Sequence, residues 1–161
     1  MIEKCLETTI LLGIYETGIK LVSKNLEFVQ KAGLSNQQWV ILIHLAKDPN
    51  LPYLIREKHD KPMMASELAE SLGVTRANIT NLISVLMDKK LIKQIEDKSD
   101  RRIKRLVLTP KAEQLITGMN SERMKSNKEH LKGLSMEEKK QFLSLLQKIT
   151  HNIMNDKTVH A

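Results

Sequence analysis

The sequence predicts a mainly α-helical fold with one small β-hairpin wing, arranged as a winged helix-turn-helix domain with N- and C-terminal dimerisation helices. Two stretches of helical apolar spacing meet at a glycine, two strand-like runs then flank a charged turn, and amphipathic helices lie on either side. We therefore expect the winged domain at residues 34–110 and a helical dimerisation region at residues 1–33 and 111–161.

Length and composition indicate a soluble globular protein. The chain has 161 residues, of which 41% are hydrophobic and 28% charged. No apolar run approaches the ~20 residues that span a bilayer, and the N-terminus lacks a secretion signal, so we expect a cytoplasmic protein without a membrane partner. The net charge of +7 favours an anionic partner, and nucleic acid fits better than a membrane because basic residues gather at the hairpin.

Residues 2–32 predict one long amphipathic helix, because apolar residues recur at seven-residue intervals, at positions 14, 21 and 28 and at positions 15, 22 and 29. Gly33 and Ser35 interrupt it, and a second helix follows. Trp39 lies within a continuous apolar run of that second helix, so we expect it in the core rather than against a ligand.

Residues 47–62 predict a loop, since Pro49 and Pro52 interrupt regular structure. The segment could enlarge an effector pocket, contact a partner subunit or reach DNA, but we favour a tolerated surface insertion. Residues 62–64 could supply a short first strand of the winged domain.

The helix-turn-helix is predicted within residues 65–86. Its first helix ends at Gly73. Thr75 is placed to cap the second helix, because the Thr75 hydroxyl can accept a hydrogen bond from a backbone N–H. The second helix has an apolar inner stripe and a small, polar outer face, which suits entry into a DNA major groove. The inner stripe consists of Ile79, Leu82, Ile83 and Leu86. The candidate DNA-binding residues are Thr75, Arg76, Ala77, Asn78, Thr80, Asn81 and Ser84.

A β-hairpin with a cationic tip is predicted between residues 91 and 109, and it is expected beside the duplex backbone or minor groove. Asp100 is expected to pair with a neighbouring arginine and to fix its direction, because a bidentate carboxylate restricts a mobile guanidinium. The basic residues assigned to the phosphate-facing wing are Lys98, Arg101, Arg102, Lys104 and Arg105.

From Lys111 the chain is expected to be helical again until Gly133, and Ser135 with Glu138 forms a capping box for a last helix. Amphipathic helices at both ends of a small winged domain need a surface on which to bury their apolar stripes. A second copy of the same helices provides that surface, so we expect a homodimer.

The sequence offers no catalytic, cofactor or metal signature. It has one cysteine, Cys5, and none of the common hydrolase, metalloprotease or phosphate-loop motifs. The five histidines do not share a helix at spacings of three or four residues, so we expect no metal site. We expect no enzymatic activity and no cofactor.

The stretches LSNQQWVILIHLA, SELAESLGVTRANITNLISVLMDKKLI and EDKSDRRIKRLVLTPKA resemble the MarR family of transcription regulators, over residues 34–112. The most specific part is D-x-x-D-R-R before a strand that ends in Leu-Thr. The resemblance implies a homodimer on double-stranded DNA with a pseudo-palindromic operator, and a repressor relieved by a small-molecule effector. It also implies that Asp100 orients the wing, that Arg102 enters the minor groove and that Arg101 lies at the backbone.

The chain departs from the family pattern at several positions, where Met64 replaces Ser or Thr, Lys90 replaces Gly, Gln94 replaces Arg and Ala112 replaces Gly. Two other classes of function are compatible with this fold. A protein-interaction module would grip a partner through the terminal helices without binding specific DNA, and an RNA-binding winged helix would prefer single strands or A-form duplex.

Overall fold

The computed structural model describes residues 4–51 and 61–155 of the chain. It confirms the mainly helical fold with a two-stranded antiparallel hairpin. The central part of the predicted 47–62 loop lies outside the described residues. In chain order the elements are α1 (Leu6–Lys31), α2 (Asn36–Leu45), α4 (Ala65–Leu72), α5 (Arg76–Asp88), β1 (Ile92–Glu96), β2 (Lys104–Leu108), α6 (Pro110–His130) and α7 (Met136–Asn155).

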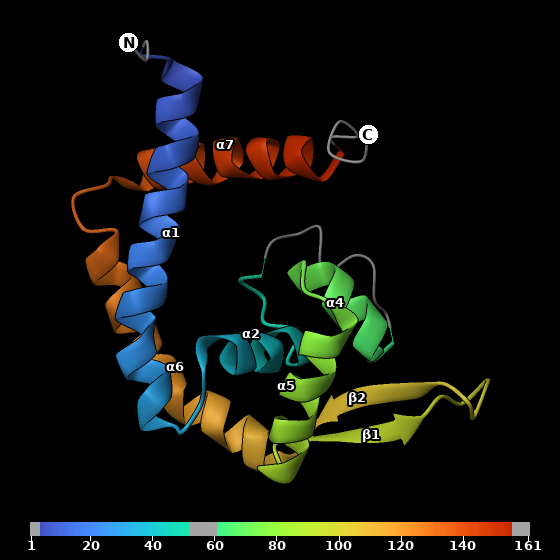
Figure 1. Ribbon diagram of the computed structural model, residues 1–161. Coiled ribbons are helices and arrows are strands. Elements are labelled where there is room, and N and C mark those ends of the chain that lie inside the picture. The colour runs from blue at the N-terminus through green and yellow to red at the C-terminus, as the bar shows by residue number, and fades with distance from the viewer. Residues whose placement is uncertain (1–3, 52–60, 156–161) are drawn as a thin grey trace.

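The elements form a compact winged domain with long helices leading away from it (Figure 1). The α2, α4 and α5 helices gather at one end of the molecule, and the β1–β2 hairpin projects from them. The α6 helix leaves the hairpin and returns towards the other end, where α7 lies far from the winged domain. Within the described chain, no helix is both long and apolar enough to cross a membrane.

The core lies inside the winged domain and draws on nearly every element around it. Trp39 is 7% exposed, which confirms its predicted place in the core. Its ring meets the edge of Phe28 from α1, at 5.8 Å between ring centroids and 89° between planes. The largest fully buried side chains are Val29, Ile41, Leu42, Leu68, Ile79, Leu86 and Leu106.

An ion pair fastens α6 to the end of α2. Arg123 of α6 donates to the buried carboxylate of Asp48, and its guanidinium lies 6.0 Å from the centre of the Trp39 ring. Burial alone would raise the pKa of Asp48, but hydrogen bonds from Asn50 and Arg123 hold that pKa below its ordinary value. The winged domain and the long helices are therefore joined through a charged contact as well as through apolar packing.

Side-chain caps begin several helices where the sequence predicts them. The Thr75 hydroxyl accepts from the Asn78 N–H at 3.2 Å. Ser135 and Glu138 exchange two hydrogen bonds, at 3.2 Å and 2.7 Å, at the start of α7. Met64 has no capping oxygen, but its N–H donates to the Glu67 carboxylate at 2.7 Å, so half of a capping box forms at α4. The predicted caps of α5 and α7 are confirmed.

The helices α1, α2, α4 and α5 end in the same way, with one residue in the left-handed conformation. Gly33 follows α1 with φ of 69°, Gly73 follows α4 with φ of 62°, and Lys90 follows α5 with φ of 58°. At Lys90, the N–H groups of residues 90 and 91 bond back to Met87 and Leu86, at 2.8 Å and 2.9 Å, as in a Schellman motif. Lys90 and Lys47, which follows α2 with φ of 51°, adopt this conformation with a Cβ atom, and this costs about 1 kcal/mol at each position.

We expect Lys90→Gly to raise the free energy of unfolding by up to about 1 kcal/mol, because glycine adopts the left-handed region without steric cost. Urea unfolding measures this change. Lys90→Ala is the matched control, since alanine also removes the charge but keeps the Cβ atom. Equal stability of the two variants would show that the left-handed conformation carries no penalty at this position.

The hairpin pairs Ile92 with Leu108 and Glu96 with Lys104 at its two ends. Residues 62–64, which could have formed a first strand, are not a strand in the structure. They contribute a single backbone hydrogen bond to the hairpin, from the Leu106 N–H to the Met63 carbonyl at 2.8 Å. Pro62 has no N–H to donate, which limits how far a ladder can extend on this side.

Candidate nucleic-acid interface

The predicted recognition helix, α5, is held by its inner stripe and presents its opposite face to solvent. Ile79, Ile83 and Leu86 are 5% exposed or less, and Leu82 is half-buried. These four residues fix how α5 lies against the rest of the domain, so the outward residues keep one orientation. The predicted apolar stripe is confirmed.

The outward residues of α5 differ in burial and in whether their side chains already form hydrogen bonds within the protein. Asn78 is half-buried, whereas the other candidates are exposed. The Thr75 hydroxyl caps the helix, and the Thr80 hydroxyl donates to the Arg76 carbonyl at 2.7 Å. Within the described residues, the side chains of Asn81 and Ser84 make no hydrogen bond, so their donors and acceptors are open to a ligand. The exposed candidates on α5 are Thr75, Arg76, Ala77, Thr80, Asn81 and Ser84.

At the wing tip, Asp100 holds Arg102 through two parallel hydrogen bonds. The Arg102 guanidinium donates to both carboxylate oxygens, at 3.2 Å from Nε and 3.1 Å from Nη2, and its backbone N–H donates at 3.0 Å. Bonding from the Arg102 side chain and then its N–H lowers the pKa of Asp100. The predicted pairing is confirmed. Arg102 is nevertheless 91% exposed, so a fixed cation points into solvent.

The other basic residues of the tip are exposed and surround this pair. Lys98 and Arg101 are exposed, and Lys104 forms a 2.8 Å ion pair with Glu96 on the opposite strand. An exposed cross-strand pair of this kind contributes little to stability, so Lys104 can exchange its partner for a phosphate at small cost.

Arg105 does not belong with these exposed cations, and its assignment to the phosphate-facing wing is wrong. Its side chain is 12% exposed and its Nε donates to Asp97, whose side chain is 4% exposed. Its Nη1 donates to the Pro62 carbonyl at 2.7 Å and lies 3.8 Å from the Glu67 carboxylate. Arg105 points back at the domain because its partners lie before α4 and inside the hairpin turn.

We name Asp97, Arg105, the Pro62 carbonyl and Glu67 the wing anchor. Asp97 also accepts from the N–H and the hydroxyl of Ser99, each at 2.8 Å, which shapes the turn of the hairpin. Bonding to Arg105, and then to Ser99, holds the pKa of Asp97 far below its ordinary value, so it stays ionised. The wing anchor therefore links the hairpin turn to the start of the helix-turn-helix. The sequence contained one signal for it, an acid and an arginine on opposite arms of the hairpin.

In the described part of the chain, no group of three histidine, cysteine, aspartate or glutamate side chains could hold a metal ion. The arrangement instead offers open hydrogen-bonding groups on α5 and cations on a braced hairpin. These two features serve recognition of a polyanion, and neither supplies a nucleophile or a proton-transfer pair.

Comparison with known proteins agrees with this geometry. Residues 32–103 match the model of the MarR family. The chain is similar to the transcriptional regulator PA3341, with a TM-score of 0.71 and 26% identity over 92% of this chain and 98% of that one. It is also similar to a MarR protein from Peptoclostridium difficile (TM-score 0.77, 23% identity, 96% and 94% covered). The S. aureus MepR–DNA complex shares the fold (TM-score 0.70, 22% identity, 92% and 99% covered). The winged-helix segment of the chain, residues 32–103, is that of a MarR-family transcriptional regulator.

Proposed function

We propose that the protein is a homodimeric, sequence-specific repressor that binds a pseudo-palindromic operator in double-stranded DNA and releases it when a small molecule binds. The observation that carries the proposal is the pairing of two features on one domain. The outward face of α5 leaves Asn81 and Ser84 open, and the hairpin beside it holds Arg102 extended into solvent. A base-reading helix and a groove-directed arginine can then engage one duplex together.

In this proposal α5 enters the major groove while the wing follows the backbone or the minor groove. Arg76, Asn81 and Ser84 would meet base edges, and the exposed cations of the wing would meet phosphates and the groove floor. The S. aureus relative was solved with DNA, which supports duplex DNA as the partner. The whole set of proposed contacts is Thr75, Arg76, Ala77, Asn78, Thr80, Asn81, Ser84, Lys98, Asp100, Arg101, Arg102 and Lys104.

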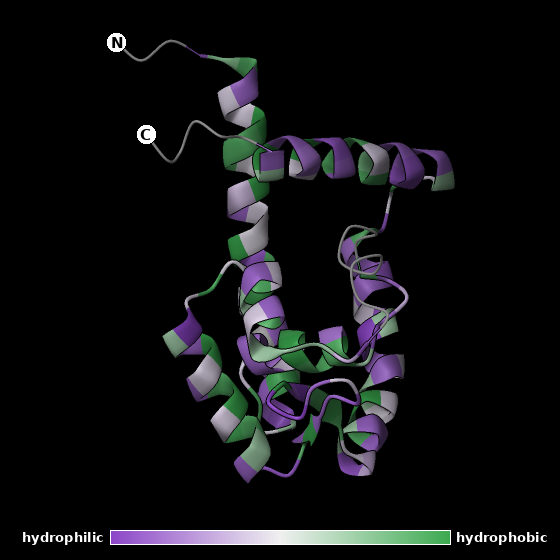
Figure 2. Cartoon of the chain, turned by 90° about the vertical axis from the view of Figure 1, so that its right-hand side faces the viewer, coloured by the Kyte–Doolittle hydropathy of each residue, from purple (hydrophilic) through white to green (hydrophobic). Residues whose placement is uncertain are grey.

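The terminal helices support a homodimer, because they expose large apolar side chains that one subunit leaves uncovered. On α1, Leu6 and Tyr15 are 69% and 67% exposed, and on α7, Ile153 is 63% exposed. Figure 2 shows apolar segments along both helices. No described residue of α7 is buried. A second copy brings the same stripes to a shared interface and covers them.

A dimer also supplies the mechanism of repression and release. The two α5 helices must reach successive major grooves about 34 Å apart. A small molecule that binds one spacing of the winged domains better than another shifts the population of dimers towards that spacing. The operator then loses affinity without any change at the reading helix itself.

The test is genomic selection of DNA fragments by the purified protein, followed by affinity measurements on the best fragment at several salt concentrations. We expect a pseudo-palindrome, one dimer per site by sedimentation, and an affinity that falls steeply with salt as bound counterions are released. Weak binding without sequence preference, at any salt concentration, would contradict the proposal and favour a protein-interaction module.

A further inference from the structure

The side chain of Lys61, from the segment before α4, reaches the turn of the hairpin. Its Nζ donates to the Ser99 hydroxyl at 3.3 Å and lies 3.9 Å from the Asp97 carboxylate. Lys61 and Ser99 lie 38 positions apart in the sequence, so only the fold brings them together. Ser99 directly precedes Asp100, the carboxylate that holds Arg102. The Lys61 ammonium therefore lies at the turn that carries the exposed, fixed arginine of the wing.

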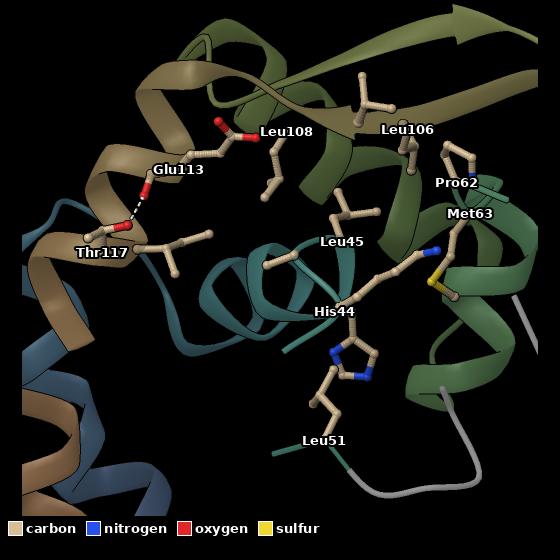
Figure 3. Close-up of a pocket in the computed structure, with 13 residues that line it drawn as sticks. His44, Leu45, Leu51, Pro62, Met63, Leu106, Leu108, Glu113 and Thr117 are labelled. Carbon is tan, nitrogen blue, oxygen red and sulfur yellow. Dashed lines mark hydrogen bonds between the residues drawn. The ribbon is translucent and has the colours of Figure 1, made fainter. Parts of the chain in front are cut away.

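The backbone of Lys61 is fixed beside the hairpin by the two residues that follow it. Pro62 and Met63 lie next to Leu106 of β2 (Figure 3). The Pro62 carbonyl accepts from the Arg105 guanidinium at 2.7 Å, and the Met63 carbonyl accepts from the Leu106 N–H at 2.8 Å. The main chain that carries Lys61 is thus bonded to the same strand that leads away from the wing tip.

Asp97 does not depend on Lys61 for its partners. One of its carboxylate oxygens accepts from Nε of Arg105, and the other accepts from the N–H and the hydroxyl of Ser99. Among the groups that lower the pKa of Asp97, Arg105 has the largest effect, Ser99 follows and Lys61 has the smallest. Lys61 can therefore turn to another anion while the buried carboxylate keeps its hydrogen bonds and its paired cation.

Lys61 itself is open to a phosphate. Its side chain is 62% exposed, and its ammonium has three N–H donors, of which one reaches the Ser99 hydroxyl. An exposed lysine at 3.9 Å from a carboxylate gains little from that contact, so exchanging it for a phosphate costs little. Because Arg105 already neutralises Asp97, Lys61 adds one net positive charge to the surface beside the wing tip.

We propose that Lys61 is a further DNA-binding residue, which binds a backbone phosphate beside the groove that Arg102 enters. The minor groove is only about 6 Å wide and a sugar-phosphate strand borders each side, so a cation at the turn that inserts Arg102 lies close to one strand. A phosphate contact carries no sequence information, so Lys61 strengthens binding to every duplex. This inference rests on the proposed DNA binding and adds to it a residue from outside both α5 and the hairpin.

The first experiment measures the affinity of Lys61→Gln for the selected operator and for a scrambled duplex at four salt concentrations. We expect both affinities to fall severalfold at low salt, and the slope of affinity against salt to decrease by about one charge. Lys61→Arg keeps the charge and should keep the slope. Lys125→Gln removes an exposed charge from the part of α6 that leads away from the winged domain, and should change neither quantity. An unchanged slope in Lys61→Gln would overturn the proposal.

A double-mutant cycle with Arg102→Ala separates a direct contact from a positioning role. If Lys61 binds a phosphate of its own, the effects of Lys61→Gln and Arg102→Ala on operator affinity should add to within about twofold. If Lys61 only steadies the hairpin turn, Arg102→Ala should cost several-fold less in the Lys61→Gln background, and that result would overturn the contact. Thermal melting shows that the variants are folded at the assay temperature.

A cleavage experiment places the residue on the duplex. Cys5→Ser removes the one cysteine of the chain, so Lys61→Cys in that background accepts a single iron–EDTA label, which cuts nearby DNA backbone when ascorbate and peroxide are added. We expect cuts at the same groove as those from a label at Lys98→Cys in the wing, and none from a label at Lys125→Cys. Cuts from the label at position 98 without cuts from the label at position 61 would overturn the proposal.

The same measurements separate this contact from the proposed function. If the unmodified protein binds the operator and Lys61→Gln keeps its affinity and salt slope, the contact is wrong and the proposed function stands. If the unmodified protein binds every duplex equally and Lys61→Gln lowers the slope, the contact stands and the sequence-specific function is wrong. If the unmodified protein binds no duplex at any salt concentration, both are wrong.

Discussion

Arg102→Ala is expected to weaken binding to every duplex and to reduce the slope of affinity against salt by about one charge. Asp100 holds the Arg102 side chain in one direction, and that side chain remains 91% exposed. Arg102 can therefore contact the duplex without breaking its pairing with Asp100 and without losing further side-chain freedom. In the proposed complex Arg102 contacts the phosphate-lined groove, so its loss should weaken the binding of specific and non-specific DNA alike. Titration of labelled operator and of a scrambled duplex, each at four salt concentrations, measures both effects.

Asn81→Ala is the matched comparison, and we expect it to change sequence preference instead of the salt dependence of binding. Asn81 is exposed at the centre of the outward face of α5 and carries no charge. Its loss should leave the salt slope unchanged and reduce discrimination between the operator and a single-base variant by about 1–3 kcal/mol. If both variants kept the affinity and specificity of the unmodified protein, the assignment of α5 and the wing to DNA would fall.

The elements of the winged domain could be predicted from sequence because their signals are local. The turn at Gly73, the cap at Thr75 and the stripe of Ile79, Ile83 and Leu86 each depend on residues within one or two helical turns. The pairing of Asp100 with Arg102 is equally local, since only Arg101 separates them in the sequence and a turn brings them together. Signals within a few residues of one another therefore suffice to predict these helix boundaries and this ion pair.

The wing anchor could not be predicted in the same way, because its members come from three segments. Arg105 is followed by the buried Leu106 in a strand, and the sequence alone makes it one more cation among the five of the tip. Its true partners, Asp97 and the Pro62 carbonyl, lie eight and 43 residues away. Only the packing of the hairpin against the start of α4 shows that this arginine faces inward. For the same reason, the sequence alone does not show that the His44 side chain is buried.

Arg105→Gln should weaken operator binding even though Arg105 is too buried to contact DNA. The wing anchor ties the hairpin turn to the segment before α4 through Asp97 and the Pro62 carbonyl. Glutamine removes the charge that pairs with Asp97, so the hairpin should sample more orientations relative to α5. Each orientation that carries Arg102 away from the groove lowers the affinity. Lys104→Gln removes the same charge from the neighbouring, exposed position. It can lose a phosphate contact of its own but leaves the wing anchor intact, so it is the control for the coupling between Arg105 and Arg102.

The measurement is a double-mutant cycle with Arg102→Ala, from operator affinities at one salt concentration. If Arg105 acts by positioning the wing, Arg102→Ala should cost several-fold less in the Arg105→Gln background than in the unmodified protein, because the wing has already lost its orientation. The same cycle with Lys104→Gln should be additive, since Lys104 pairs with Glu96 on the opposite strand and does not belong to the wing anchor. Thermal melting confirms that all variants are folded at the assay temperature. Additive effects of Arg105→Gln and Arg102→Ala would contradict this positioning role. They would show that the wing anchor stabilises the fold without orienting the wing, because the contribution of Arg102 to each bound complex would then be unchanged.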